Sequence, residues 1–408
     1  MSIDYRMIRD DELAAFDECQ RIGMVGDPST AELIERRRTF QEIDRSIAAF
    51  DEGQVVGTAS AFTKRLTTPG GEVAMGGLTM VSVRSTHRRK GILTEMMRRH
   101  FEDCMARKEP LSGLYAAEAP IYGRFGYGIA TQQVDLKIDR DHSTLEHVPE
   151  IRGRLRMIES DQAREQWPAV WDAVRQVQPG MLDVSQAWWS RMLFDPAERR
   201  EGMTSLRHVS YEVDGEIQGF VMYRQQDRWE EHLPSGRLKV VKLIAATPEA
   251  YAALWQYLFG IDWMKTIECE QRAADEPLYH MLLDERRLRR TADDGVWLRI
   301  LDVERALAAR TYATEGRVTF EVHDAFLPDV GGTFVLEGGA GGASCMRAGG
   351  HEGGAVRLGV AELSAIYLGG TRLSTLARAG RVSGEAAAIG LADLMFTAGV
   401  PPWCPEGF

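Results

Sequence analysis

The chain has 408 residues, 44% of them hydrophobic, and a formal net charge of −11 at pH 7. This length exceeds one ordinary hydrophobic core and indicates two or three domains. The negative charge argues against nucleic acid as a partner, no run of about 18 apolar residues predicts a membrane span, and the charged opening is unlike a signal peptide, so we expect a cytoplasmic protein.

The cysteines are few and widely spaced: Cys19, Cys104, Cys269, Cys345 and Cys404. They form no Cys-x-x-Cys pair, which is the commonest signature of a structural zinc site or a redox centre. We therefore expect no disulfide and no metal.

The first region, residues 1–141, alternates helical and strand patterns. Asp51-Glu52-Gly53-Gln54 separates two apolar runs and indicates a hairpin, and Gly76-Gly77 marks a bulge or turn in a later strand. Patterns typical of helices cover 11–17 and 31–43, and patterns typical of strands cover 46–50, 55–62, 73–83, 115–118 and 134–138. We expect these strands to form one sheet, which Val134 to Ile138 closes.

The strand at 73–83 runs into a basic, glycine-containing turn that opens a helix. The turn contains Arg88-Arg89-Lys90-Gly91, and apolar residues recur at helical spacing from Ile92 to Met105. The first amides of a helix lack partners within it and the helix dipole favours an anion there, so the arrangement indicates a pyrophosphate-binding turn. The alternative is a solvated charge run that caps a surface helix.

This stretch resembles the coenzyme A pyrophosphate motif of the GNAT acetyltransferases. In that motif an Arg or Gln is followed after two residues by Gly and two residues later by Gly or Ala; Arg88 and Gly91 match and Leu93 departs. A bulky residue at the last position is typical of the Eis-type branch. The segment 121–128, Ile-Tyr-Gly-Arg-Phe-Gly-Tyr-Gly, is similar to the Eis signature, and the chain ends in an aromatic residue after Pro-Trp-Cys, as Eis proteins do.

The resemblance implies a mixed α+β (α/β) fold with two tandem GNAT-like domains, residues 1–141 and 142–303, and a sterol-carrier-like α/β domain, residues 304–408. In the second region Ala246-Thr247-Pro248-Glu249 replaces Arg-Arg-x-Gly, so this copy should repel a pyrophosphate. We interpret it as a degenerate GNAT fold. The expected elements are a helix at 162–176, a hairpin at 209–223, a strand at 238–245 and a helix at 248–259, followed in the third region by strands at 318–322 and 333–335 and helices at 358–365 and 372–379.

The resemblance also implies acetyl-CoA as co-substrate and assigns residues to it. Residues 81–83 would pair with the pantetheine amides and turn N–H groups toward the thioester carbonyl, and residues 88–94 would hold the pyrophosphate. The predicted cofactor-binding residues are Val81, Ser82, Val83, Arg88, Arg89, Lys90, Gly91, Ile92, Leu93, Thr94, Ala117 and Glu118.

Two groups are candidates for proton transfer. The general acid of the family matches Tyr122, whose phenol can protonate a leaving thiolate and stay neutral at rest; Tyr127 is the alternative, with a packed core aromatic as its other interpretation. In Eis proteins the chain end folds back into the first domain, so the carboxylate of Phe408 is expected there as a base or an anchor. The other interpretation of the tail is a frayed terminus.

The function that follows is acetyl transfer to amines of cationic polyamine-like acceptors such as aminoglycosides, with a small-molecule amine as partner. Two alternatives stay open: a protein or peptide lysine acetyltransferase, and a non-catalytic ligand or lipid carrier. Family members assemble as hexamers, so we expect a homohexamer without nucleic acid or a membrane span.

Overall fold

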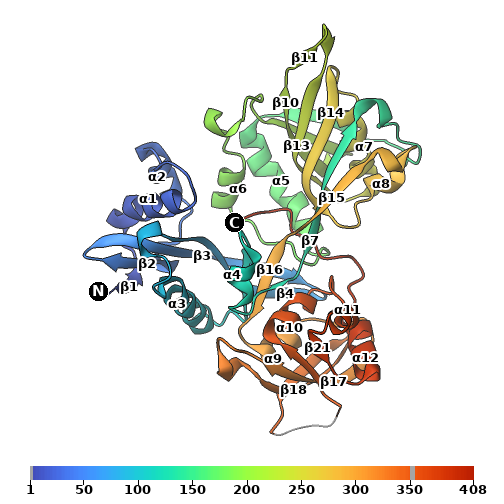
Figure 1. The fold of residues 1–408 in the computed structure, drawn as a ribbon. Helices are drawn as coiled ribbons and strands as arrows, with labels where there is room; N and C mark the ends of the chain where they lie inside the picture. The colour runs from blue at the N-terminus through green and yellow to red at the C-terminus, as the bar shows by residue number, and fades with distance from the viewer. Residues whose placement is uncertain (1–2, 350–353) are drawn as a thin grey trace. The chain divides into compact units, whose positions relative to one another are not determined.

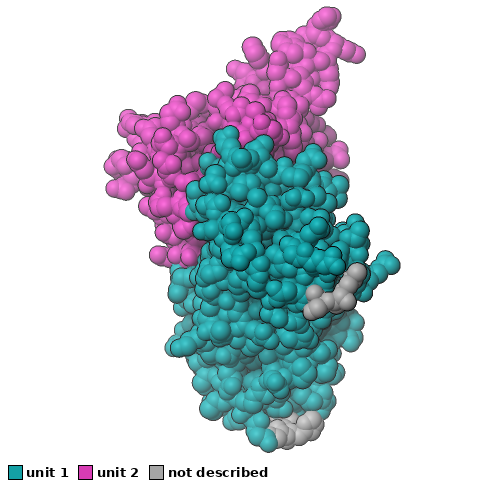
Figure 2. Space-filling view, turned by 90° about the vertical axis from the view of Figure 1, so that its left-hand side faces the viewer, with its two compact units in different colours: residues 1–131, 296–400, 406–408 teal, residues 132–295, 401–405 magenta. Residues whose placement is uncertain are grey.

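The computed structural model describes residues 3–349 and 354–408. The chain divides into two compact units (Figure 2): one comprises residues 1–131, 296–400 and 406–408, and the other comprises residues 132–295 and 401–405. Each unit is therefore assembled from segments that are distant in the sequence.

The first unit contains a mixed sheet with the strand order β1-β2-β3-β4-β5-β16-β6 (Figure 1). Its strands are β1 (Asp4–Met7), β2 (Ser46–Asp51), β3 (Gln54–Thr68), β4 (Gly71–Val83), β5 (Leu111–Tyr115), β6 (Gly128–Ile129) and β16 (Val296–Ile300). Its helices are α1 (Leu13–Gly23), α2 (Ala31–Arg38), α3 (Ile92–Ala106) and α4 (Ala119–Gly123).

Strand alternation places helices on both faces of this sheet. Successive side chains point to opposite faces, so Ile47 and Ala49 pack in the cluster that includes the apolar side of α3, whereas Ala48 and Phe50 pack in the cluster that includes α1. The apolar spacing of Ile92, Met96, Met97 and Phe101 in α3 is thus explained by one buried face.

The same unit holds a second, smaller sheet with the order β19-β18-β17-β20-β21. The elements of this third region are β17 (Gly316–His323), β18 (Gly332–Gly339), β19 (Gly342–Arg347), β20 (Val356–Gly359), β21 (Val382–Ser383), α9 (Val303–Ala308), α10 (Val360–Ile366), α11 (Leu373–Arg378) and α12 (Ala386–Phe396). The buried ion pair Arg299–Asp324 joins this region to β16 of the first sheet.

The second unit contains a sheet with the order β8-β9-β10-β13-β14-β7-β15. Its elements are β7 (Gln132–Asp139), β8 (Arg154–Ile158), β9 (Arg207–Val213), β10 (Glu216–Gln226), β11 (Trp229–Glu230), β12 (Leu233–Pro234), β13 (Gly236–Ala245), β14 (Met264–Ala273), β15 (Arg289–Asp294), α5 (Ser160–Arg175), α6 (Gln186–Met192), α7 (Pro248–Phe259) and α8 (Leu278–Met281). Phe220 and Met222 of β10 pack in the cluster that includes α5, and Val221 and Tyr223 pack in the cluster that includes α7.

The two large sheets have the same plan and exchange one strand. Position by position, β1, β2, β3, β4 and β5 correspond to β8, β9, β10, β13 and β14, and the next position is antiparallel to its neighbours in both sheets. That position is β16 in the first sheet and β7 in the second. The expectation that Val134 to Ile138 closes the first sheet is therefore wrong, because these residues pair with β14 and β15.

Several expected elements differ from the structure in extent. The helix expected over 31–43 stops at Arg38, and the strand expected over 115–118 is instead Leu111–Tyr115. Gly76 and Gly77 pair regularly with β3 and form no bulge or turn. Residues 358–359 belong to β20, and the helix there begins at Val360. These errors lie at element ends, where local pattern is weakest.

Three properties bear on the type of protein. Across residues 3–349 and 354–408, every helix is too short or too polar to cross a membrane. Within the described part of the chain, no three His, Cys, Asp or Glu side chains gather as a metal site would require, and the absence of a metal stays a prediction. The five cysteines are buried and carry free thiols.

Candidate active site

The end of one strand ladder leaves part of β4 without a neighbour on one side. β4 and β5 run parallel and pair from Met75–Leu111 to Gly77–Gly113, whereas β4 continues to Val83. We call residues 78–83 the unpaired segment of β4, because no strand among the described residues pairs with them on the β5 side. Backbone groups of this kind can pair with an extended amide ligand. The segment contains the predicted contacts 81–83.

A bulge distorts this segment. Between the pairs Thr58–Ser82 and Ser60–Thr79, β4 has one residue more than β3. Met80 adopts a positive φ of 54° there, and Thr58 Oγ1 donates to the Met80 carbonyl over 2.8 Å. Bulges re-aim backbone groups and are frequent beside active sites. The bulge therefore turns backbone N–H groups of the segment away from the regular ladder.

The predicted pyrophosphate-binding turn has the geometry of a helix N-terminus with room in front of it. Gly91 is the N-cap of α3 with a φ of 82°, and a Cβ at that position would meet no atom within 4 Å. Glycine is thus needed for its left-handed backbone rather than to relieve a clash. The first internal bond of α3 runs from Glu95 N to Gly91 O, so the amides of Ile92, Leu93 and Thr94 precede it.

The side chains of this turn divide into two groups. Arg88, Arg89 and Lys90 are exposed at the surface. Ile92 is 1% exposed and packs into the core, so its predicted role in binding can be carried only by its backbone. The pyrophosphate-binding role of this turn stays a prediction beside the alternative of a surface charge run.

Tyr122 and Tyr127 pack against each other, and the Tyr127 hydroxyl takes part in a buried hydrogen bond. Their rings meet edge to face at 6.0 Å. The Tyr127 hydroxyl lies 2.7 Å from Ser112 Oγ, which donates to the Gly76 carbonyl over 3.2 Å. Because Ser112 donates its only hydroxyl proton to the Gly76 carbonyl, its oxygen must accept the proton of the Tyr127 hydroxyl. The Tyr127 proton is therefore held in a buried hydrogen bond.

Tyr122 is the better proton donor of the two. Burial, followed by the charge of Glu118, raises its pKa, so the phenol is protonated at neutral pH. Burial raises the pKa of Tyr127 well above its ordinary value, and the hydrogen bond described above occupies that hydroxyl. Glu118 is the N-cap of α4, and Ala117 stands exposed before it, so both predicted cofactor contacts lie next to the helix that carries Tyr122.

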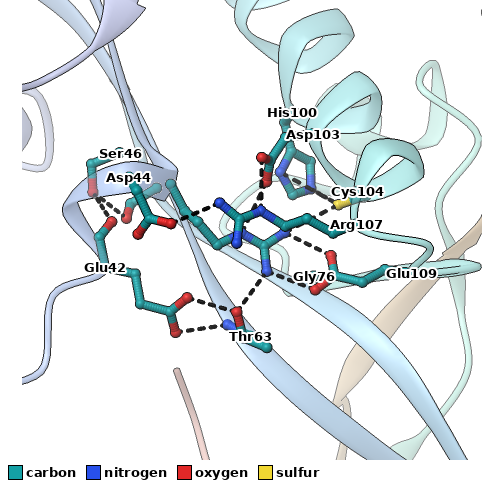
Figure 3. A network of polar contacts seen from close by, with 12 residues as sticks. Glu42, Asp44, Ser46, Thr63, Gly76, His100, Asp103, Cys104, Arg107 and Glu109 are labelled. Atoms are coloured by element: carbon teal, nitrogen blue, oxygen red, sulfur yellow. Dashed lines mark hydrogen bonds and ion pairs between the residues drawn. The ribbon is translucent and has the colours of Figure 1, made fainter.

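A buried polar network lies between α3 and the neighbouring strands (Figure 3). The Arg45 guanidinium, with its side chain 0% exposed, binds Glu109 through two hydrogen bonds of 2.7 and 2.6 Å and Asp103 at 2.9 Å. Burial alone lowers the pKa of Arg45, but the hydrogen bond and charge of Glu109 raise it overall. Arg45 Nη2 also approaches the Cys104 thiol at 3.6 Å. The network fixes α3 against the strands where the β4–β5 ladder ends.

His100 links this network to the tyrosines. Its Nε2 lies 2.7 Å from Ser112 Oγ. Since Ser112 donates its proton to the Gly76 carbonyl, His100 Nε2 carries the hydrogen and donates it to Ser112. Burial, followed by the charge of Arg45, lowers the pKa of His100 to about 3. His100 thus joins the Arg45 network to Ser112 and Tyr127.

The lowered pKa of His100 predicts acid sensitivity. In the unfolded chain His100 binds a proton below about pH 6.5, whereas in the native state it does so only near pH 3. The free energy of unfolding is therefore highest above pH 6.5 and falls as the pH is lowered, by about 2 kcal/mol at pH 5. Urea unfolding at pH 7.5 and pH 5 should show this loss, and His100→Gln should reduce it. An equal loss in the variant would contradict a neutral native His100.

The chain terminus lies on the unpaired segment of β4. Thr79 Oγ1 donates to the Phe408 carboxylate oxygen over 3.1 Å, and the Phe408 ring meets Tyr115 edge to face at 5.5 Å. A Cβ on Gly77 would lie 3.0 Å from the same ring, so glycine is needed there for close packing. The Tyr115 hydroxyl donates to the Glu406 carbonyl over 2.9 Å. The terminus is thus docked and not frayed.

Tyr122 packs against Tyr127, which is linked through Ser112 to Gly76, and the Phe408 ring packs against the next residue of β4, Gly77. That Tyr122 and Phe408 act in one site stays a prediction. Thr79, Ser112 and Tyr115 were missed in the sequence, since a Thr, Ser or Tyr in a strand carries no signal of its own.

Comparisons with known proteins identify the family and the domains of the chain. Models described as acetyltransferase (GNAT) domains match residues 4–130 and 180–300, and a sterol carrier protein domain model matches residues 303–405. An uncharacterized N-acetyltransferase of Streptomyces avermitilis is 38% identical over 100% of both chains. The N-acetyltransferase Eis of Mycobacterium tuberculosis is 35% identical over 76% of each chain. The crystal structure of Eis1 from Mycobacterium abscessus has a TM-score of 0.84 and 31% identity over 100% of both chains.

The chain belongs to the Eis-type GNAT N-acetyltransferase family. The expected fold of two tandem GNAT domains and a sterol-carrier-like domain is confirmed. A GCN5-related N-acetyltransferase from Anabaena variabilis, at 18% identity and a TM-score of 0.87 over 100% of both chains, shares this fold. The Eis-type chain is an acetyltransferase, and its GNAT domains imply use of an acyl-CoA donor.

Proposed function

We propose that this Eis-type enzyme transfers acetyl from acetyl-CoA to amines of cationic, polyamine-like acceptors such as aminoglycosides. The observation that carries the proposal is the terminal carboxylate of Phe408, docked on Thr79 beside a bulged strand whose backbone is open on one side. A carboxylate next to a thioester site is suited to an amine acceptor, because it attracts an ammonium and can accept its proton.

The residues of the first domain fit acetyl-CoA, which supplies an activated acyl group when bound. Backbone groups within residues Val81, Ser82 and Val83 would pair with the amides of an extended pantetheine, and an N–H of this bulged segment would face the thioester carbonyl. The first-turn amides of α3, together with Arg88, Arg89 and Lys90, hold the pyrophosphate, for which the empty space in front of Gly91 leaves room. Ala117 and Glu118 complete the cofactor contacts.

In this proposal two residues move protons. Tyr122 protonates the leaving thiolate, and the Phe408 carboxylate takes the ammonium proton or anchors the ammonium. An α-carboxyl with a pKa of about 3.3 to 3.7 is a weak base for an amine, so its base role requires desolvation or a relaying water. The proposed domains are a catalytic GNAT domain at 1–141, a degenerate GNAT copy at 142–303 and a closing domain at 304–408 whose tail supplies Phe408. The sheets depart from these bounds, because β7 belongs to the second sheet and β16 to the first.

The second copy offers a physical reason for its lack of ligand. Glu249, near the start of α7, accepts hydrogen bonds from Tyr211 and from the Arg152 backbone at 2.5 and 2.8 Å. These bonds, that of Tyr211 first, lower its pKa to about 2, so the carboxylate is charged. A negative charge at a helix N-terminus repels phosphate.

The acceptor class is tested by thiol release from acetyl-CoA with aminoglycosides, simple polyamines and lysine peptides. We expect kcat/KM to be at least about tenfold higher for aminoglycosides than for lysine peptides, because a polycation gains from the carboxylate and from the net charge of −11. Preference for lysine peptides would favour the protein acetyltransferase, and no release with any amine would favour the carrier. A homohexamer is part of the proposal by family resemblance.

A further inference from the structure

The second GNAT-like domain repeats the strand geometry of the active site. β13 and β14 run parallel and pair from Gly236–Met264 to Val240–Cys269, whereas β13 continues to Ala245. A register shift opposite Met222 and Tyr223 leaves Val241 as an extra residue, so a bulge follows the last pair. Residues 241–245, the unpaired segment of β13, therefore correspond to the unpaired segment of β4.

This segment contacts the polypeptide's own tail. The Trp403 indole Nε1 donates to the Gln271 carbonyl over 2.7 Å, and Lys242 Nζ donates to the Pro405 carbonyl over 2.5 Å. Trp403 N also donates to the Pro179 carbonyl over 2.8 Å. Each strand of the pair thus holds one tail residue, in the place where the first domain would hold pantetheine.

The fit around Trp403 is tight. Trp403 is 6% exposed and belongs to the apolar cluster of α5 and β10, and the Arg272 guanidinium lies 5.0 Å from its ring centre. Arg272 is itself fixed by Glu276 at 3.0 Å and by the Leu243 carbonyl at 2.6 Å. The space left between the tail and these strands is about 10 Å³, room for no more than one water molecule.

We propose that the former ligand site of the second domain is the docking site for residues 401–405, and that Trp403 is a positioning residue for the carboxylate of Phe408. The inference rests on the proposed function for its catalytic consequence. Residues 397–408 follow α12, and docking of residues 401–405 shortens the segment that must reach Thr79 from these twelve residues to residues 406–408. A shorter free segment raises the effective concentration of the terminus at Thr79.

Release of Phe408 by a carboxypeptidase tests the anchor without reference to activity. We expect wild-type protein to lose Phe408 slowly, Trp403→Ala to lose it at least about tenfold faster, and Trp403→Phe, which keeps an aromatic ring, to lie between them. The matched control is Trp229→Ala, since Trp229 is 55% exposed in the same unit and should leave the rate unchanged. Equal rates for wild type and Trp403→Ala would overturn the proposal.

A second arm leaves the protein unaltered. The amidated peptide Pro-Pro-Trp-Cys-Pro at millimolar concentration should compete for the site and accelerate loss of Phe408 from wild-type protein, whereas the peptide with Ala in place of Trp should not. Identical rates with both peptides would contradict a site that recognises Trp403. This peptide competition remains a test of the docking site even if the Trp403→Ala variant fails to fold.

Kinetics separate positioning from general damage. Trp403→Ala should lower kcat roughly tenfold with the KM for acetyl-CoA unchanged, and Trp403→Phe should recover part of kcat. A rise in the KM for acetyl-CoA with unchanged kcat would contradict a positioning role. If wild-type protein acetylates no amine, the proposed function fails, while the peptidase result still decides whether the tail is anchored.

Discussion

Blocking the terminal carboxylate should lower kcat by about 100-fold or more while the KM for acetyl-CoA stays within about twofold. The carboxylate accepts from Thr79 Oγ1 at 3.1 Å on the unpaired segment of β4, along which the proposed function runs the pantetheine and its acyl group. Amidating Phe408 removes its charge and keeps its ring against Tyr115, so only the proton acceptor is lost.

Two variants make this measurement specific. A chain extended by Gly-Ser after Phe408 moves the charge away from Thr79, and Phe408→Leu keeps a terminal carboxylate on an apolar side chain as the matched control. Loss of kcat in the extended chain alone assigns the effect to the carboxylate. Unchanged turnover in the extended chain removes the carboxylate from the mechanism.

The same variants decide between base and anchor. If the carboxylate is the base, the loss appears in kcat at every acceptor concentration. If it anchors the substrate cation, the KM for the amine rises and kcat recovers at saturation.

Replacing Tyr122 by Phe should lower kcat by about 10² to 10⁴-fold with little change in either KM. Tyr122 is the buried phenol in the α4 segment, and its pKa is raised by burial and by Glu118, so it is protonated through the neutral range. Any loss of activity from its ionisation should therefore lie above about pH 10 in the wild type. Thiol release from pH 6 to pH 10.5 measures both effects.

Tyr127→Phe is the matched control, because it removes a hydroxyl from the adjoining ring. Its hydroxyl serves Ser112, so we expect kcat within about threefold of wild type and a stability loss of about 1 to 3 kcal/mol from the lost buried hydrogen bond. A larger fall in kcat for Tyr127→Phe than for Tyr122→Phe would exchange the assignment of the general acid.

Local signals in the sequence predicted the parts of the fold that depend on local chemistry. α7 runs from Pro248 to Phe259 as expected, because Thr247 caps it and proline suits a first helical position. The start of α3 after Gly91 follows for a similar reason, since only glycine adopts φ > 0 without strain.

Strand partners and long-range contacts had no such signal. Val134, Leu136 and Ile138 alternate in the same way as Val296, Leu298 and Ile300, so the pattern identifies two strands and cannot say which sheet each joins. β5 was misplaced because Ser112 and Gly113 interrupt its apolar run.

The catalytic neighbourhood was predictable only in part. Family resemblance supplied Tyr122 and the tail, but the pairing of Thr79 with Phe408 spans 329 positions of sequence, which no local pattern records. The docking of Trp403 depends on the end of β13 in the second GNAT-like domain, and no local pattern of the sequence indicates it.

The strand exchange between the two large sheets also determines when the first sheet can be completed during synthesis. The first sheet needs β16, and the hydrogen bond from Val296 N to Thr131 Oγ1 closes it, so this sheet stays incomplete until residue 300 has left the ribosome. By then all of β7 to β15 has been synthesised. A gene split after residue 131 would therefore leave the first sheet without β16, whereas residues 132–294 carry every strand of the second sheet. The first chain would have to bind the second before its sheet could be completed.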